Sequence, residues 1–271
     1  MNQRARTLFL AASVGGVILA LYAIGLLLPE DVLAANYLEA RQAPSLAHLF
    51  GTDTLGRDLF FRTLKGLSVS MTVGICASLA SAVIAIIVGA CAASGSKRLD
   101  TAVNWCIDLV MSVPHMILII LISFALGRGM TGLLVGIAAT HWCSLARLIR
   151  GEVLQLKAQP YVLLSRQMGH SSWWILRHHL LPHLVPQFIV GLVLLFPHAI
   201  LHEASVSFLG FGLPPEEPAI GIILSESMRS LSAGMWWPAV LPGAMLVLLV
   251  LAIDRLGEAL NRVLDPASAQ E

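Results

Sequence analysis

The chain has 271 residues, of which 57% are hydrophobic and 12% are charged, and its mean hydropathy is +0.80. A soluble domain needs roughly twice that share of charged residues to cover its surface, so the composition excludes a water-soluble globule and predicts a protein surrounded by lipid. The formal net charge of +1 argues against a nucleic-acid partner. The four cysteines lie in apolar stretches without C-x-x-C spacing, which favours buried, unreactive thiols over a disulfide framework or a metal site.

The first apolar run covers residues 8–28 and predicts a membrane helix. Its 21 residues exceed the apolar part of a secretory signal, which is about 7–15 residues long. At about 1.5 Å per residue, a helix of this length crosses the hydrocarbon core. We therefore expect it to be retained as the first transmembrane helix.

A long loop follows at residues 29–68 and contains a polar, glycine-containing segment. This segment reads Gly51-Thr52-Asp53-Thr54-Leu55-Gly56-Arg57-Asp58. Its glycines permit tight backbone turns, and Asp53 or Thr54 can cap a helix. Asp58 can pair with Arg62 one helical turn later.

Five further apolar segments predict the remaining membrane helices. They cover about residues 69–93, 103–126 (interrupted by Pro114), 133–148, 185–209 and 236–253. In lipid an isolated strand cannot satisfy its backbone polar groups, and the alternation of a barrel strand is absent. The sequence thus predicts an all-α membrane protein with about six transmembrane helices. We divide it into residues 1–68 (first helix and external loop), 69–258 (a core of five helices) and 259–271 (a tail).

The distribution of lysine and arginine orients these helices. One side of the membrane receives Arg4, Arg6, Lys97, Arg98, Arg147, Arg150, Lys157, Arg166, Arg177, Arg255 and Arg262. The other receives Arg41, Arg57, Arg62, Lys65, Arg128 and Arg229. Because positive residues accumulate on the cytoplasmic side, the first set predicts that both termini lie inside the cell.

The second long loop, at residues 151–182, is then cytoplasmic and predicts two short helices. Pro160 suits the first position of a helix, and Gly169 suits the residue just past its end. Between them, Tyr161, Leu164 and Met168 recur at helical spacing and form one apolar stripe. This short helix lacks the basic face of a helix that lies on a membrane surface, so we expect it to dock into a groove on a protein partner.

The second short helix of this loop is expected to begin at Ser171 or Ser172, either of which can serve as its cap. We expect it to stop near Pro182, since proline interrupts helical hydrogen bonding.

The fifth apolar segment carries ionisable residues, which are functional candidates inside a membrane. His198 and His202 are four residues apart and share a helix face, whereas Glu203 points about 100° away from His202, on the side of Ser207. One interpretation makes these four residues a polar pathway wall that contacts a metal, a metal chelate or a peptide terminus. The other is hydrogen bonding that locks the helices together.

Other polar residues in the apolar segments admit structural explanations. His202-Glu203 begins an H-E-x-x-H zinc motif, but Val206 occupies the place of the second histidine. An intramembrane metalloenzyme is therefore disfavoured, and no firm metal ligands are assigned. Asp100 and Asp108 are expected to pair with Arg147 or Arg150. His115 and His141 could line a pore, although packing is the commoner role for such residues.

Four stretches of the chain resemble the permeases of ABC importers. Leu181-Pro182, ending thirteen residues after Gly169, is similar to their EAA-type coupling loop, which inserts into a cleft on the ATPase. The Glu-Ala-Ala of that loop is replaced here by Leu163-Leu164-Ser165, so the charged contact of its Glu is absent. Residues 51–58 resemble the GTDxLGRD signature of permeases that import dipeptides, oligopeptides and nickel. The run from Ser207 to Pro215 resembles their SFLGLG-type segment, and Asp265-Pro266 their usual end.

The resemblance covers about residues 8–266 and implies a heteromeric importer in the inner membrane. Its parts would be this chain, a homologous second permease, two ATPase subunits and an external solute-binding protein. No Walker motif G-x-x-x-x-G-K-[ST] occurs in the chain, so we expect it to bind no cofactor, with ATP and magnesium on the partner subunits. The resemblance assigns ATPase coupling to Pro160, Tyr161, Leu163, Leu164, Ser165, Met168, Gly169, Leu181 and Pro182.

The substrate is the least determined feature. The run from His198 to Phe211, continued by residues 217–221, resembles the nickel and metallophore branch more than the peptide branch, which favours nickel or another metal chelate. Di- or oligopeptides are the alternative. The expected mechanism is alternating access without covalent chemistry, driven through the short helix at residues 160–168.

Overall fold

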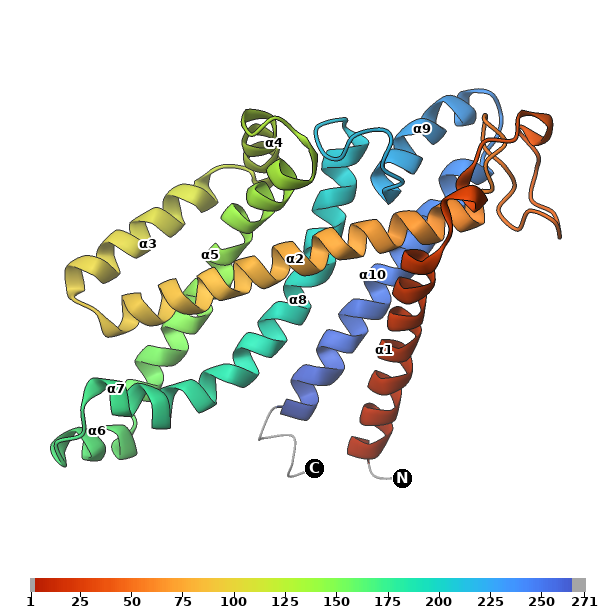
Figure 1. Ribbon diagram of the computed structural model, residues 1–271. Coiled ribbons are helices and arrows are strands. Elements are labelled where there is room, and N and C mark those ends of the chain that lie inside the picture. Colours follow the sequence, from red (N-terminus) through yellow and green to blue (C-terminus); the bar gives the residue numbers. More distant parts are fainter. Residues whose placement is uncertain (1–2, 265–271) are drawn as a thin grey trace.

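The computed structural model describes residues 3–264 and is almost entirely helical (Figure 1). Its α-helices are α1 (Gln3–Leu27), α2 (Leu59–Ser94), α3 (Lys97–Ser112), α4 (His115–Ala125), α5 (Gly129–Lys157), α6 (Pro160–Gln167), α7 (Ser172–Ile175), α8 (Leu181–Phe208), α9 (Ile220–Ser232) and α10 (Trp237–Leu264). Two 3₁₀ turns, η1 (Glu30–Leu33) and η2 (Tyr37–Glu39), lie in the first long loop, and a π-helical segment, η3 (Leu176–Leu180), joins α7 to α8. Residues 265 and 266, which resemble the usual end of the family, lie outside the described residues.

Among the described residues, five helical stretches are long and apolar enough to cross a membrane. They are α1, α2, α5, the stretch from α7 through α8, and α10. The predicted third span, residues 103–126, is instead two helices, α3 and α4, that meet at 93° and make a sixth span only if counted together. The cause is Pro114, because the residue before a proline is pushed out of the helical region, and Val113 is indeed extended at φ −95° and ψ 135°.

The long helix α2 forms the centre of the bundle. It packs against α5 and α8, while α1 packs against both α2 and α10. Small residues allow the closest approach between α2 and α5: Ala82, Ala85 and Ala146 are completely buried. Because lipid is as apolar as leucine, such close packing is what holds membrane helices together.

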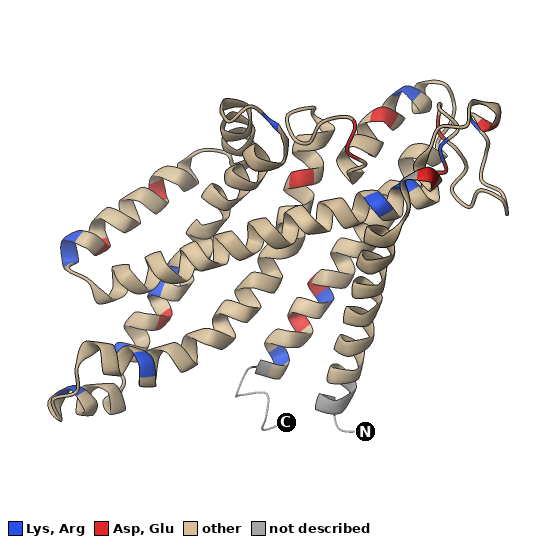
Figure 2. Cartoon of the chain, viewed as in Figure 1, with Lys and Arg blue, Asp and Glu red and all other residues tan. Residues whose placement is uncertain are grey.

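The bundle has two distinct ends (Figure 1). The start of α1, the end of α10 and the short helices α6 and α7 lie at one end, whereas α4, α9 and the first long loop lie at the other. Charged residues gather toward these ends, and the central part of α2 carries none (Figure 2). The arrangement agrees with the predicted placement of both termini and the second loop on one side of the membrane.

Two loop boundaries differ from the predicted ones. The first loop ends at Asp58 rather than at residue 68, because α2 starts at Leu59 with Asp58 as its N-cap. The second connection is shorter than residues 151–182, since α5 continues to Lys157. Ser171 caps the second short helix as predicted, but that helix does not stop near Pro182. It passes through η3 into α8, where Pro182 occupies the first turn and needs no N–H donor.

The four cysteines are free, but only Cys143 is buried in the chain. The expectation of buried thiols is therefore wrong for Cys76, Cys91 and Cys106, which lie on the surface of the single chain. These residues must be replaced before the topology can be tested by labelling.

The predicted orientation has a direct test in that cysteine-free background. Ser45→Cys, in the first loop, is expected to react with a membrane-impermeant maleimide added from outside. Gln167→Cys, at the end of α6, is expected to react only after permeabilisation; both native residues are exposed. The opposite labelling pattern in cells whose outer barrier admits the probe would overturn the orientation.

Candidate functional site

A cavity of about 680 Å³ lies at the end of the bundle that carries the first loop. We call it the outer cavity. Four segments line it: residues 54–57 of the first loop, the turn between α4 and α5, the segment after α8, and α9. The lining residues are Thr54, Leu55, Arg57, Gly127, Arg128, Gly129, Ser207, Gly210, Gly212, Leu213, Pro214, Pro215, Ile222, Ser225, Glu226 and Arg229.

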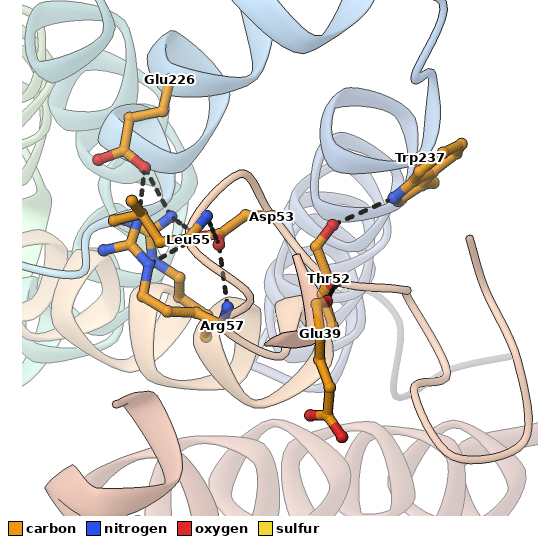
Figure 3. Close-up of polar contacts among 8 residues, drawn as sticks. Glu39, Thr52, Asp53, Leu55, Arg57, Glu226 and Trp237 are labelled. Atoms are coloured by element: carbon orange, nitrogen blue, oxygen red, sulfur yellow. Dashed lines mark hydrogen bonds and ion pairs between the residues drawn. The ribbon is translucent and has the colours of Figure 1, made fainter. Parts of the chain in front are cut away.

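An ion-pair network fastens the first loop to α9 beside this cavity (Figure 3). Asp53 accepts hydrogen bonds from Arg57 Nε at 2.6 Å and from Arg62 at 3.2 Å. Glu226 of α9 accepts from Arg57 at 3.1 Å and from Arg62 at 2.6 Å. Two arginines are thus matched by two carboxylates, and Arg62 is only 3% exposed.

The local roles within residues 51–58 differ from the predicted ones. Asp53 caps no helix; its carboxylate accepts from the backbone N–H groups of Leu55 and Arg57 and so closes a turn. Asp58 caps α2 by accepting from the N–H groups of Phe60 and Phe61. Its side-chain partner is the ring of His48, whose Nδ1 lies 2.7 Å from the carboxylate, and not Arg62, which contacts Asp53 instead.

The two glycines of this segment do act in turns, as predicted. Gly51 and Gly56 have φ values of 71° and 74°, in the left-handed region that glycine adopts without strain. Thr52 lies next to Gly51 and is completely buried. Its hydroxyl donates to the carbonyl of Glu39, and its own carbonyl accepts from Trp237 Nε1 at 3.4 Å, which ties the segment to α10 (Figure 3).

The segment after α8 is connected through Ser207 to the buried carboxylate of Glu203. Ser207 Oγ donates to Glu203 Oε1 at 2.8 Å and accepts from the N–H of Leu213 at 3.2 Å. Glu203 is completely buried, and its Oε2 has no hydrogen-bond partner among the described residues. In this conformation Glu203 faces the interior of the chain, and its hydrogen bond to Ser207 lies within α8, so this bond does not itself join two helices.

The predicted pathway histidines occupy two different places on α8. His198 is exposed and lines a smaller cavity of about 260 Å³ between α5 and α8. His202 is half-buried and contacts two histidines from other helices. Its ring lies 4.8 Å from that of His141 on α5 and 6.3 Å from that of His115 on α4.

This histidine cluster was not predicted as a unit. Its members lie far apart in the sequence, and no spacing rule connects helices α4, α5 and α8. His202 Nδ1 lies 3.1 Å from Met116 Sδ, and His115 Nε2 lies 3.2 Å from the carbonyl of Thr140. Within residues 3–264 no group of histidine, cysteine, aspartate or glutamate side chains has the geometry to hold a metal ion.

The two aspartates of α3 form the ion pairs that were predicted. Arg150 donates to both carboxylate oxygens of Asp100, at 2.5 and 2.7 Å. Arg147 donates to Asp108 at 2.7 Å. These contacts hold α3 against α5.

The second long loop contains the predicted short helix, α6, with Pro160 in its first turn. Val162 is buried and attaches α6 to the bundle, while Leu164 and Met168 are 57% and 71% exposed. Gly169 ends the helix at φ 85°. Within residues 3–264, Leu164 and Met168 thus form an apolar surface of α6 that remains exposed.

Ser165, to which the resemblance assigns the last position of the Glu-Ala-Ala, lies in α6. Its hydroxyl donates to the carbonyl of Tyr161 and lies 2.8 Å from Nε2 of His179 in η3. Leu163 points outward and is 46% exposed. The contact between Ser165 and His179 joins α6 to η3, which leads into α8. Leu181 and Pro182 are the first two residues of α8.

Comparison with known proteins decides the family. Residues 81–266 match the family model described as the binding-protein-dependent transport system inner membrane component. The dipeptide transport system permease protein DppC of Bacillus subtilis is 34% identical over 238 residues, which is 88% of this chain and 74% of that protein. The chain belongs to the ABC importer permeases. It is a multi-pass protein of the inner membrane, and its family transports without itself hydrolysing ATP.

Other relatives agree with this assignment. The oligopeptide transport system permease protein OppC of Bacillus subtilis is 32% identical over 87% of this permease and 77% of its own length. The preference for nickel drawn from residues 198–221 finds no support in these relatives, which are named for dipeptides and oligopeptides. Peptide transport, the alternative considered from the sequence, fits them better.

Two solved structures share the fold. One is a crystal structure of an amino acid ABC transporter with histidines, with a TM-score of 0.58 at 16% identity, covering 74% of this permease and 93% of that chain. The other shows inward-facing conformations of the MetNI methionine ABC transporter, with a TM-score of 0.59 at 18% identity, covering 74% and 97%. At such identities the similarity establishes the all-helical permease fold alone.

Proposed function

We propose that this permease forms half of the substrate pathway of an ATP-driven importer of dipeptides or oligopeptides. The observation that carries the proposal is the similarity to permeases named for those substrates over 87–88% of the chain. The proposed partners are a homologous second permease, two ATPase subunits that hold ATP and magnesium, and an external solute-binding protein.

The exposed surface of α6 supports docking to an ATPase. A short helix that buries one side on its own chain and leaves Leu164 and Met168 exposed is suited to fill an apolar groove on a partner. Leu163, Leu164 and Ser165 carry no charge, so we propose that packing replaces the ionic contact that a glutamate would make.

Continuity between α6 and the outer cavity supports mechanical coupling. The stretch from Ser172 to Phe208 is helical throughout and 37 residues long, which corresponds to roughly 55 Å at about 1.5 Å per residue. Ser165 contacts this stretch near one end through His179, and Ser207 lines the outer cavity near the other. In the proposed cycle, closure of the ATPases moves α6, and α8 transmits the movement to the segment after residue 208.

Among the pathway candidates, His198 is the best placed to touch a passing substrate, because it is exposed beside a cavity. We propose that His202 contributes through the histidine cluster, and that Glu203 and Ser207 position the segment after α8. A pathway contact has to be weak, because a tight site would retain the substrate.

Uptake by reconstituted vesicles tests the substrate assignment. The complete complex with its binding protein is expected to accumulate a radiolabelled dipeptide and to take up no labelled nickel above the level of empty vesicles. Nickel uptake without dipeptide uptake would overturn the peptide assignment.

The same vesicles test the pathway residues. His198→Ala is expected to lower dipeptide uptake severalfold while leaving the thermal unfolding midpoint of the complex unchanged, because the side chain is exposed and alanine suits a helix. Glu203→Gln is expected to lower the midpoint, since a fully buried group is altered. Unchanged uptake by His198→Ala would remove His198 from the pathway.

A further inference from the structure

Arg128, in the turn between α4 and α5, adopts a backbone conformation that is almost exclusive to glycine. Its φ is 63° and its ψ is −172°. Its neighbours Gly127 and Gly129 also have positive φ values, of 90° and 79°. A glycine at position 128 would adopt this conformation without strain, so the arginine is held there at a cost in stability. Such strained residues concentrate at functional sites.

The surroundings of Arg128 fix both its backbone and its side chain. The N–H of Arg128 donates to the carbonyl of Ser123 at 2.8 Å, and the N–H of Gly129 donates to the carbonyl of Gly212 at 3.0 Å. The guanidinium carbon lies 5.3 Å from the ring centroid of Phe124 and 5.4 Å from that of Phe211. Contact with two aromatic faces holds the cation in place without neutralising it.

Arg128 and Arg229 give the outer cavity an excess of positive charge. Arg57 is paired with Asp53 and Glu226, as described above. Arg128 and Arg229 also line the cavity, are exposed, and form no ion pair within the described part of the chain. Glu216 and Glu217, the acidic residues of the segment between α8 and α9, are exposed and do not line the cavity. The cavity therefore presents two uncompensated positive charges.

We propose that Arg128, together with Arg229, receives the C-terminal carboxylate of the peptide as it passes from the binding protein into the pathway. This inference rests on the proposed function of peptide import. A guanidinium matches a carboxylate with two parallel N–H donors. The C-terminal carboxylate is the anionic group common to all unmodified peptides, so its recognition suits a permease that accepts peptides of varied sequence. Exposure to water keeps the contact weak enough for release.

The test compares dialanine with its C-terminal amide in reconstituted vesicles that contain the complete complex. The binding protein is saturated with either peptide, so that uptake rates report the permease. Arg128→Gly removes the cation and also the backbone strain. Arg41→Gly is the matched control, because Arg41 is another exposed arginine at positive φ, 62°, that does not line the cavity.

Arg128→Gly is expected to lower dialanine uptake roughly tenfold, the size of one charge-assisted hydrogen bond, and to leave uptake of the amide unchanged. Its thermal unfolding midpoint is expected to equal or exceed that of the wild type, a combination that a structural role would not produce. Arg128→Lys is expected to retain part of the dialanine rate, and Arg41→Gly all of it.

Three outcomes would overturn parts of this account. Equal loss of both peptides, with weaker binding of the loaded binding protein, would assign Arg128 to contact with that protein instead. Unchanged dialanine uptake by Arg128→Gly would overturn the inference alone. Absence of dialanine uptake by the wild-type complex would overturn the proposed function, and the inference with it.

Discussion

Gly169→Val is expected to reduce ATP-driven uptake about tenfold or more while the membrane helices remain inserted. Gly169 ends α6 at φ 85°, where a β-branched residue is strained by roughly 1–3 kcal/mol. A Cβ at this position would meet no atom within 4 Å, so the effect arises from the backbone conformation and not from a clash. Relief of the strain requires the end of α6 to unwind, which displaces the surface proposed to dock on the ATPase.

Gly151→Val is the matched control for that variant. Gly151 lies within α5, and a Cβ there also meets nothing within 4 Å, but its φ is not positive. Both variants add the same side chain to open space near the same end of the bundle. Co-purification of the ATPase subunits and vesicle uptake provide the measurements. Normal assembly and transport in Gly169→Val would show that coupling does not depend on the backbone conformation of Gly169.

Arg62→Met is expected to destabilise the permease by about 3 kcal/mol, the usual cost of removing one partner from a buried ion pair. Arg62 is 3% exposed and contacts both Asp53 and Glu226. Methionine preserves much of the apolar stem but leaves Asp53, which is 7% exposed, with one cation fewer. The first loop should then separate from α9 at a lower temperature, and thermal unfolding of the purified complex measures the change.

Arg255→Met serves as the control for Arg62→Met. Arg255 pairs with Glu258 at 3.2 Å, and its side chain is 74% exposed. Exposed pairs of this kind contribute little, so no measurable change is expected. Equal midpoints for the two variants would show that the buried network does not hold the first loop in place.

Local sequence signals located most helices but not their geometry. Pro114 and Pro182 gave the same signal, a proline within or beside an apolar run, with different outcomes. Pro114 breaks the third segment at 93°, whereas Pro182 falls in the first turn of α8 and the helix continues. A proline removes one N–H wherever it stands, and the turns around it decide whether that loss matters. The π-helical segment before Pro182 had no recognisable pattern.

Among the candidate site residues, those that act through local backbone geometry were predictable from the sequence, and those that depend on packing between distant segments were not. Pro160 and Gly169 were predictable because each acts through its own backbone geometry. The pairing of Arg62 with Asp53 and the meeting of His115, His141 and His202 were not, since they depend on how distant segments pack. Arg128 does have a local sequence signal, because an arginine between two glycines at the start of a helix indicates an unusual turn.

We propose that this permease moves peptide against its gradient by coupling to ATP hydrolysis on its partners. The most direct measurement is the ratio of radiolabelled dipeptide inside to outside vesicles that contain the complete complex and its binding protein. With ATP supplied to the ATPase side, we expect a ratio well above one, which falls to one when a non-hydrolysable ATP analogue replaces ATP. Equilibration to a ratio of one, at the same rate with ATP and with the analogue, would contradict ATP-driven peptide import by this permease.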